Sequence, residues 1–160
     1  MGLNALLVCL FEESEALEHL AFKLEQEQLV LVAGRPKLLA RNSAEFEEAV
    51  KALATVSRRR EELVVVAAAE LGLAPSTTLS ALADATTDAD ERRVLTERGQ
   101  VMRAQVARIN DLCARNREIL ARNLAATTDA LALLGEGPSY TAGATTSPGT
   151  ARPRMLDARA

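Results

Sequence analysis

Leucine recurs every seven residues through the first part of the chain, at Leu3, Leu10, Leu17, Leu24 and Leu31. Leu6 or Leu7, with Leu20, fills the companion positions. A heptad repeat of apolar residues is the pattern of a helix that packs along its length against other helices. The repeat stops at Gly34, a residue that favours the left-handed end of a helix, and Pro36 follows. We therefore predict a helix over residues 3–33 that needs a partner helix.

A second heptad pattern follows, at Leu39, Phe46, Leu53, Arg60 and Ala67. It predicts a helix over residues 36–72 that ends at Gly72, shortly before Pro75. Asn42 with Glu45 three residues later also fits a capping box, so residues 36–42 are either the first turns of this helix or a loop before it. The arginines of residues 58–60 are followed directly by two glutamates, a pattern that predicts a solvated helix face.

The next segment predicts a short helix over residues 76–85 and a long one over residues 88–134. Thr87 and Asp90 form a capping box at the start of the long helix. Its apolar seam has alternating spacings of three and four residues and consists of Met102, Val106, Ile109, Cys113, Asn116, Leu120, Leu124, Thr127, Leu131 and Leu134. Asn116 has two interpretations: a buried amide that sets the helix register, or a polar residue that points out of the seam.

The composition supports helices rather than sheets, with 48% hydrophobic, 26% charged and only 2% aromatic residues. After Leu134 the chain changes to Gly, Pro, Ser and Thr, which predicts a flexible, disordered tail over residues 138–160. The predicted fold class is therefore all-α, an elongated antiparallel bundle of coiled-coil type. It has three long helices and one short helix within a domain at residues 1–137.

Several classes of function lack the residues that they need. The single histidine, His19, has no Glu-x-x-His partner for a metal and no companions for a catalytic triad, so we expect no enzyme activity, no metal and no cofactor. A net charge of -3 argues against nucleic acid as the partner. The first apolar run is interrupted by glutamates, and it has neither the length of a membrane span nor the basic start of a signal peptide. We expect a cytoplasmic protein without membrane insertion.

Residues 109–120 of the third long helix, with Asn110 and Asn116 ahead of the pair Ile119-Leu120, resemble the corresponding region of the FlgN family of flagellar export chaperones. Two further segments are similar to that family. An apolar helix end is followed by a polar spacer and residues 140–143, Tyr-Thr-Ala-Gly, and the second helix ends in Leu71-Gly72-Leu73. The resemblance spans roughly residues 3–143.

The resemblance implies a chaperone that binds the hook-associated proteins of the hook-filament junction in the cytosol. Such a chaperone prevents their premature assembly and delivers them to the export gate. The residues that it implies for client binding are Val106, Ile109, Leu112, Asn116, Ile119, Leu120, Leu124, Leu131 and Leu134. The alternative for each is simple packing against the first two helices.

Tyr140 is a lone aromatic residue in a polar tail, and such a residue can anchor in a partner pocket. The resemblance implies that this partner is the cytoplasmic domain of the export gate. The alternative is a tyrosine that folds back onto the bundle. A rival function for the whole chain is a self-associating, structural coiled-coil or adaptor protein, a homodimer for example, without a secretion client.

Overall fold

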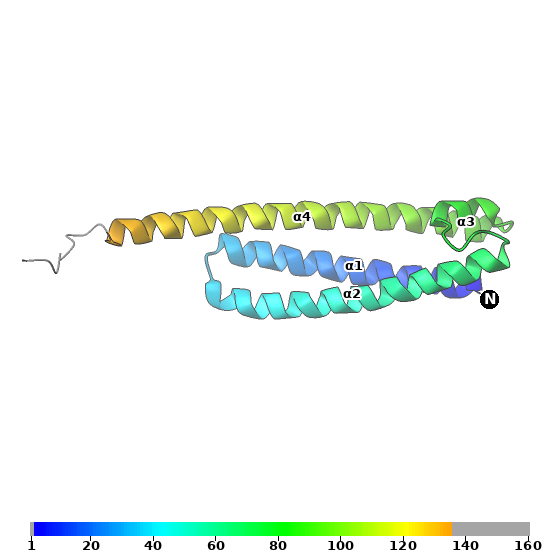
Figure 1. Ribbon diagram of the computed structural model, residues 1–160, viewed down its shortest axis with the longest axis horizontal. Coiled ribbons are helices and arrows are strands. Elements are labelled where there is room, and N and C mark those ends of the chain that lie inside the picture. Colours follow the sequence, from blue (N-terminus) through cyan, green and yellow to red (C-terminus); the bar gives the residue numbers. More distant parts are fainter. Residues whose placement is uncertain (1, 136–160) are drawn as a thin grey trace, which may run out of the picture. The chain divides into compact units, whose positions relative to one another are not determined.

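The computed structural model describes residues 2–135, which form four helices and no strand. These are α1 (Gly2–Val32), α2 (Pro36–Glu70), α3 (Leu79–Ala85) and α4 (Ala89–Gly135) (Figure 1). The all-α class and the plan of three long helices with one short helix are thus confirmed. The chain divides into two compact units, Met1–Leu124 and Ala125–Ala160. Residues 125–135, the described part of the second unit, are helical, and all their side chains are exposed.

Both long helices of the first hairpin end in the same glycine-dependent way. Gly34 has a φ of 62° and Gly72 a φ of 69°, in the left-handed region that other residues enter at a cost. At the end of α1 the Arg35 amide donates to the Val30 carbonyl at 3.3 Å, and at the end of α2 the Leu73 amide donates to the Ala68 carbonyl at 2.8 Å. These are the six-to-one bonds of the Schellman motif. They reverse the chain where the sequence predicted.

Helix α2 begins at Pro36, so residues 36–42 are helical. Asn42 is not a cap: it lies inside α2 and is buried. Proline suits the first turn of a helix because its missing N–H has no partner there in any case. The two helices of the hairpin consequently lie side by side over most of their lengths (Figure 1).

Buried charge joins α1 to α2, where the sequence suggested a solvated face. Arg60 forms an ion pair with Glu13 at 2.7 Å, and Glu13 is only 4% exposed. Ser57 donates a hydrogen bond to the other oxygen of the Glu13 carboxylate at 2.7 Å, and Arg59 pairs with Glu12 at 2.8 Å. The prediction of a solvated face was therefore wrong for Arg60, because α1 supplies a buried carboxylate opposite it, whereas Arg59 is exposed as predicted.

Helix α3 closes one end of the bundle. It starts at Leu79, three residues later than predicted, because the Thr78 side chain caps it by accepting from the Ala81 amide at 3.1 Å. Its Leu82 is fully buried in a cluster whose other members are Leu6, Leu10, Val64, Ala67, Ala68, Ala83 and Leu95. All four helices contribute to this cluster. We call this part of the molecule the closed end.

The start of α4 is fixed by Asp88 rather than by the predicted capping residue Thr87. The Asp88 carboxylate accepts from the amides of Asp90 and Glu91 at 2.9 and 3.0 Å. A carboxylate at this position satisfies amides that lack partners within the helix and also opposes the positive end of the helix dipole. Arg92 then donates to the Thr86 carbonyl at 2.7 Å and so ties α4 back to the end of α3.

No helix within residues 2–135 is long and apolar enough to cross a membrane.

We predict that Leu82→Ala lowers the free energy of unfolding by about 2 to 4 kcal/mol, because it leaves a cavity where four helices meet. Urea denaturation followed by circular dichroism measures the change. The control Leu38→Ala alters a leucine of α2 that is 45% exposed, and its effect should stay below about 0.5 kcal/mol. Equal effects for the two variants would contradict the role given to α3.

Candidate functional site

Helix α4 lies along α1 through a series of side-chain amides. Gln105, Asn116 and Asn123 donate to the backbone carbonyls of Ser14, Leu24 and Leu31 at 3.2, 2.9 and 3.1 Å. The partners advance together along both helices, so α4 runs parallel to α1, whereas α2 is antiparallel to it. Each α1 carbonyl sits in a helix and can accept a second bond, because a carbonyl oxygen has two lone pairs. Polar bonds at three points along the two helices therefore set the register of α4.

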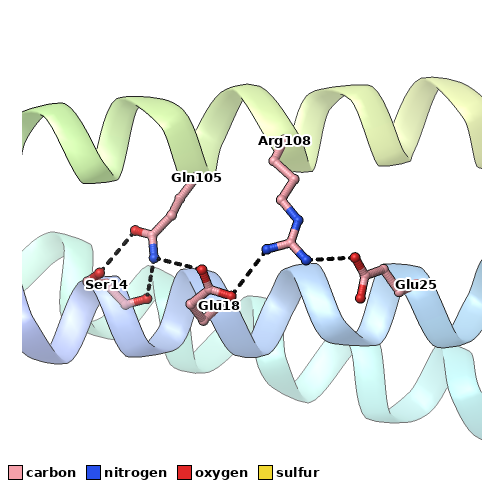
Figure 2. A network of polar contacts seen from close by, with 5 residues as sticks. All are labelled: Ser14, Glu18, Glu25, Gln105 and Arg108. Carbon is pink, nitrogen blue, oxygen red and sulfur yellow. Dashed lines mark hydrogen bonds and ion pairs between the residues drawn. The ribbon is translucent and has the colours of Figure 1, made fainter.

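Around Gln105 the amides become part of a larger polar network (Figure 2). Gln105 also accepts a hydrogen bond from the Ser14 hydroxyl at 3.0 Å and donates to Glu18 at 3.3 Å. One turn further on, Arg108 reaches both Glu18 at 3.3 Å and Glu25 at 2.7 Å. Arg108 is about half exposed, so solvent screens these ion pairs. They orient α4 on α1 more than they stabilise it.

The apolar core thins beyond this network. Away from the closed end, the buried cluster consists only of Ala21, Leu24 and Leu112, with Phe46, Ile109 and Cys113 partly buried against it. No helix plays the part of α3 here in the described chain. We call this region the open end of the first unit.

A pocket of about 320 Å³ lies at the open end, between α1, α2 and α4. Its apolar wall consists of Leu24, Leu31, Leu39, Phe46 and Leu120. Polar groups also line it, namely Glu27, Ser43, Cys113, Asn116 and Arg117. An apolar hollow with a few polar groups has the character of a binding site rather than of a solvated surface. We refer to it as the open-end pocket.

Asn116 supplies the most specific polar group of this pocket. It is 5% exposed, and its amide nitrogen donates to the Leu24 carbonyl and to Glu27 at 2.9 and 2.8 Å. Its amide oxygen is buried and has no hydrogen-bond partner among the described residues. Of the two interpretations from the sequence, the buried amide in the seam is therefore the one that the structure shows. A buried acceptor without a donor is costly.

The residues expected to bind a client fall into three groups. Leu112 and Asn116 are buried, and Ile109 and Ile119 are half-buried. The exposed members within the first unit are Val106, Leu120 and Leu124, at 45%, 50% and 67% exposure.

Leu131 and Leu134 belong to the second unit and are 64% and 79% exposed. Tyr140 lies outside the described residues.

Sequence reasoning missed two contributions to this region. The sequence analysis gave Gln105 and Arg108 no role. Gln105 stands three residues after Met102, on the same face of α4, and a polar residue at such a position can indicate a buried hydrogen bond, as at Asn116. The α2 side of the pocket is formed by Leu39 and Phe46. Both belong to the predicted heptad pattern, but a heptad pattern does not predict a pocket.

Cys9 and His19 lie at different depths in the first unit. Burial raises the pKa of the Cys9 thiol, which donates to the Val56 carbonyl at 3.7 Å and so stays protonated within the hairpin. His19 is exposed on α1. Within residues 2–135, no group of three or more His, Cys, Asp or Glu residues is placed to hold a metal ion.

We predict that Asn116→Asp destabilises the first unit by about 2 to 3 kcal/mol near neutral pH, because it places a buried anion beside the Leu24 carbonyl and Glu27. Asn116→Leu should change stability by less than about 1 kcal/mol, since it removes the unpaired oxygen together with the donor. Thermal unfolding measures both.

The matched control is Asn110→Asp, the same change at an exposed position of α4. Lower pH should restore part of the stability of the Asn116→Asp variant, since a protonated carboxyl can donate again. An Asn116→Asp variant as stable as Asn110→Asp would contradict the buried bond.

Comparison with known proteins agrees with the arrangement of these helices. The model of one family, described as FlgN protein, matches residues 1–148, which is nearly the whole chain. No curated protein and no solved structure matches the chain. A match of this extent includes all four helices, the network at Gln105 and the open-end pocket. The chain belongs to the FlgN family of flagellar export chaperones.

Proposed function

We propose that this chain binds hook-associated proteins in the cytosol by taking an amphipathic helix of the client against α4 at the open end, prevents their premature assembly and delivers them to the export gate. The observation that carries the proposal is the open-end pocket, where α1, α2 and α4 leave apolar side chains uncovered beside the buried oxygen of Asn116, which has no hydrogen-bond partner among the described residues. Family membership supports a hook-associated protein as the kind of partner.

A single column of α4 leads into this pocket. Val106, Cys113 and Leu120 stand seven residues apart, and the last two line the pocket. Residues at this spacing share one face of a helix. A second helix can pack against such a face along its length. A client helix in that position would bury Val106 and Leu120 and extend the thin cluster around Leu112.

The unpartnered oxygen of Asn116 adds specificity to this apolar contact. A client helix that offers an N–H or O–H donor there would satisfy a buried group that has no partner otherwise. A helix with the same apolar pattern and no donor would leave the Asn116 oxygen without a hydrogen bond. The pocket therefore favours clients with one polar residue inside an apolar stripe.

We predict that Val106→Ser with Leu120→Ser weakens binding of hook-associated proteins by at least about tenfold, because each buried aliphatic side chain is worth roughly 1.5 to 3 kcal/mol in the complex. Calorimetric titration of purified clients measures this, and a sizing column with light scattering gives the stoichiometry. The double variant should unfold like the unchanged chain, since both side chains are already exposed.

The matched control is Val65→Ser with Val66→Ser on α2, whose side chains are 45% and 47% exposed. Client binding that survives the α4 variant would contradict the proposed site. A mass that rises with concentration, and falls to the monomer in the α4 variant without any client, would favour the self-associating coiled-coil protein instead.

We further propose that Tyr140 docks the chaperone on the cytoplasmic domain of the export gate. The support is the sequence context, a lone tyrosine in a segment rich in Gly, Pro, Ser and Thr. Leu131 and Leu134, exposed on the second unit, remain candidates for client contact by themselves.

For Tyr140→Ala we expect weaker binding to the gate domain and unchanged client binding, whereas Tyr140→Phe should keep most of the affinity because the ring remains. Pull-down of the gate domain with and without bound client separates the two activities. Equal loss of gate and client binding would instead favour a tyrosine that packs on the helices.

A further inference from the structure

Two arginines stand beside the column of Val106, Cys113 and Leu120 on α4. Arg103 comes three residues before Val106, and Arg117 comes three residues before Leu120. Residues three apart are neighbours on a helix surface, so each arginine is adjacent to an exposed aliphatic side chain of the column. Both arginines are exposed, and Arg117 also lines the open-end pocket. The column therefore has a basic edge.

This edge lies on the side of the column away from α1. The other neighbours of the column are Ile109 and Asn116, each three residues after a column residue. Asn116 donates to the Leu24 carbonyl of α1, and Ile109 packs on the cluster that contains Leu24. Positions three before and three after a residue lie to its opposite sides on a helix. A client helix that covered the column would thus place one of its own flanks against the two arginines.

Most other arginines of α4 already have partners. Arg92 donates to the Thr86 carbonyl, and Arg98 stacks on the ring of Phe11. Ion pairs with carboxylates engage three more, namely Arg93, Arg108 and Arg122. Arg103 and Arg117 form no ion pair among the described residues. Their charges are available to a partner.

The sequence of α4 keeps carboxylates away from these two positions. The residues one turn before and after them are all uncharged: Gly99, Gln100, Val106 and Ala107 around Arg103, and Cys113, Ala114, Leu120 and Ala121 around Arg117. Arg115, on the opposite face of α4, instead has Asp111 and Glu118 at that distance. The surroundings of Arg103 and Arg117 are therefore apolar or small, without a counter-charge from their own helix.

The pocket itself contributes one carboxylate to its lining, that of Glu27. Glu27 belongs to α1 and accepts a hydrogen bond from the Asn116 amide at 2.8 Å. It forms no ion pair with Arg117. The α4 edge of the pocket thus keeps an unbalanced positive charge.

The two arginines share one register of α4. They stand 14 residues apart, which is two heptads and about 21 Å along the helix at 1.5 Å per residue. A client helix that lies along the column, in either direction, meets both of them if its own flanking residues repeat at the same interval.

We propose that Arg103 and Arg117 determine which client helices bind, by pairing with Asp or Glu side chains two heptads apart on one flank of the client's apolar stripe. This inference rests on the proposed function. Charged groups at the edge of an apolar contact steer association and penalise partners of like charge more than they add affinity. The column supplies the contact, and the two arginines supply the discrimination.

Calorimetric titration of purified hook-associated proteins into the full chain tests the role of the two charges. Arg103→Gln with Arg117→Gln should weaken binding by about five- to tenfold at low salt, because two exposed ion pairs are lost. The difference from the unchanged chain should disappear near 1 M salt, where charges are screened within about 3 Å.

The matched control is Arg115→Gln with Arg122→Gln, which removes the same charge from the opposite face of α4. It should bind the client as the unchanged chain does. Equal weakening in the two variants would assign the effect to net charge and overturn the proposal. Full binding in the Arg103→Gln, Arg117→Gln variant at low salt would overturn it as well.

Two synthetic amphipathic helices test the sign of the preference. They share one apolar stripe and carry either two glutamates or two lysines, two heptads apart, on the same flank. Fluorescence anisotropy should show at least about fivefold tighter binding of the glutamate peptide. The chain has a net charge of -3, so unspecific attraction would favour the lysine peptide instead. Arg103→Glu with Arg117→Glu should reverse the preference. Equal affinities, or no binding of the glutamate peptide, would overturn the proposal.

The serine variants of the column separate this inference from the proposed function. If Val106→Ser with Leu120→Ser abolishes client binding and the arginine variants do not alter it, the client site stands and the charge rule falls. If the client still binds the serine variant, the proposed site itself falls.

Discussion

The rest of the structure depends on the way α1 is shared between two neighbours. Its leucines repeat every seven residues, so one continuous face must be buried along its whole length. A single partner helix covers only part of such a face. Helix α2 covers one side as an antiparallel hairpin, and α4 covers the other as a parallel helix that returns after α3. Both arrangements rest on the same buried side chains.

The two neighbours are held by different physical means. The α1–α2 contact combines close apolar packing with the buried pair of Glu13 and Arg60, in which the loss of either partner would leave the other without its counter-charge. The α1–α4 contact includes side-chain amides of α4 that donate to backbone carbonyls of α1. Polar bonds exchange with water at a small net cost. This difference suits a hairpin that acts as a scaffold and a helix that offers its remaining face to a client.

The two ends of the bundle differ for a reason that lies in the chain connections. The link from α2 to α4 contains α3, whose Leu82 fills the space between the long helices at the closed end. The link from α1 to α2 is a tight turn at Gly34 and contributes no side chain to the core at its own end. The open-end pocket remains because the short α1–α2 turn supplies no side chain to fill it. It places uncovered apolar surface, together with the unpaired oxygen of Asn116, beside the face of α4 proposed to bind the client.

The sequence by itself determined the features that depend on residues near one another in the chain. The heptads determined the long helices, and Gly34 and Gly72 determined where two of them end, because helix formation and termination are decided within a few turns. Short-range signals misled at the start of α4, where Thr87 and Asp88 stand side by side, and at Arg60, whose carboxylate partner lies on α1.

Only the tertiary structure decided which positions of each seam are covered. It buried Glu13 against Arg60, turned Asn116 inward, and left Val106 and Leu120 exposed. These outcomes depend on how far α2 and α4 reach around α1. That reach is set by packing between segments roughly 45 to 90 residues apart in the chain, which no local pattern contains.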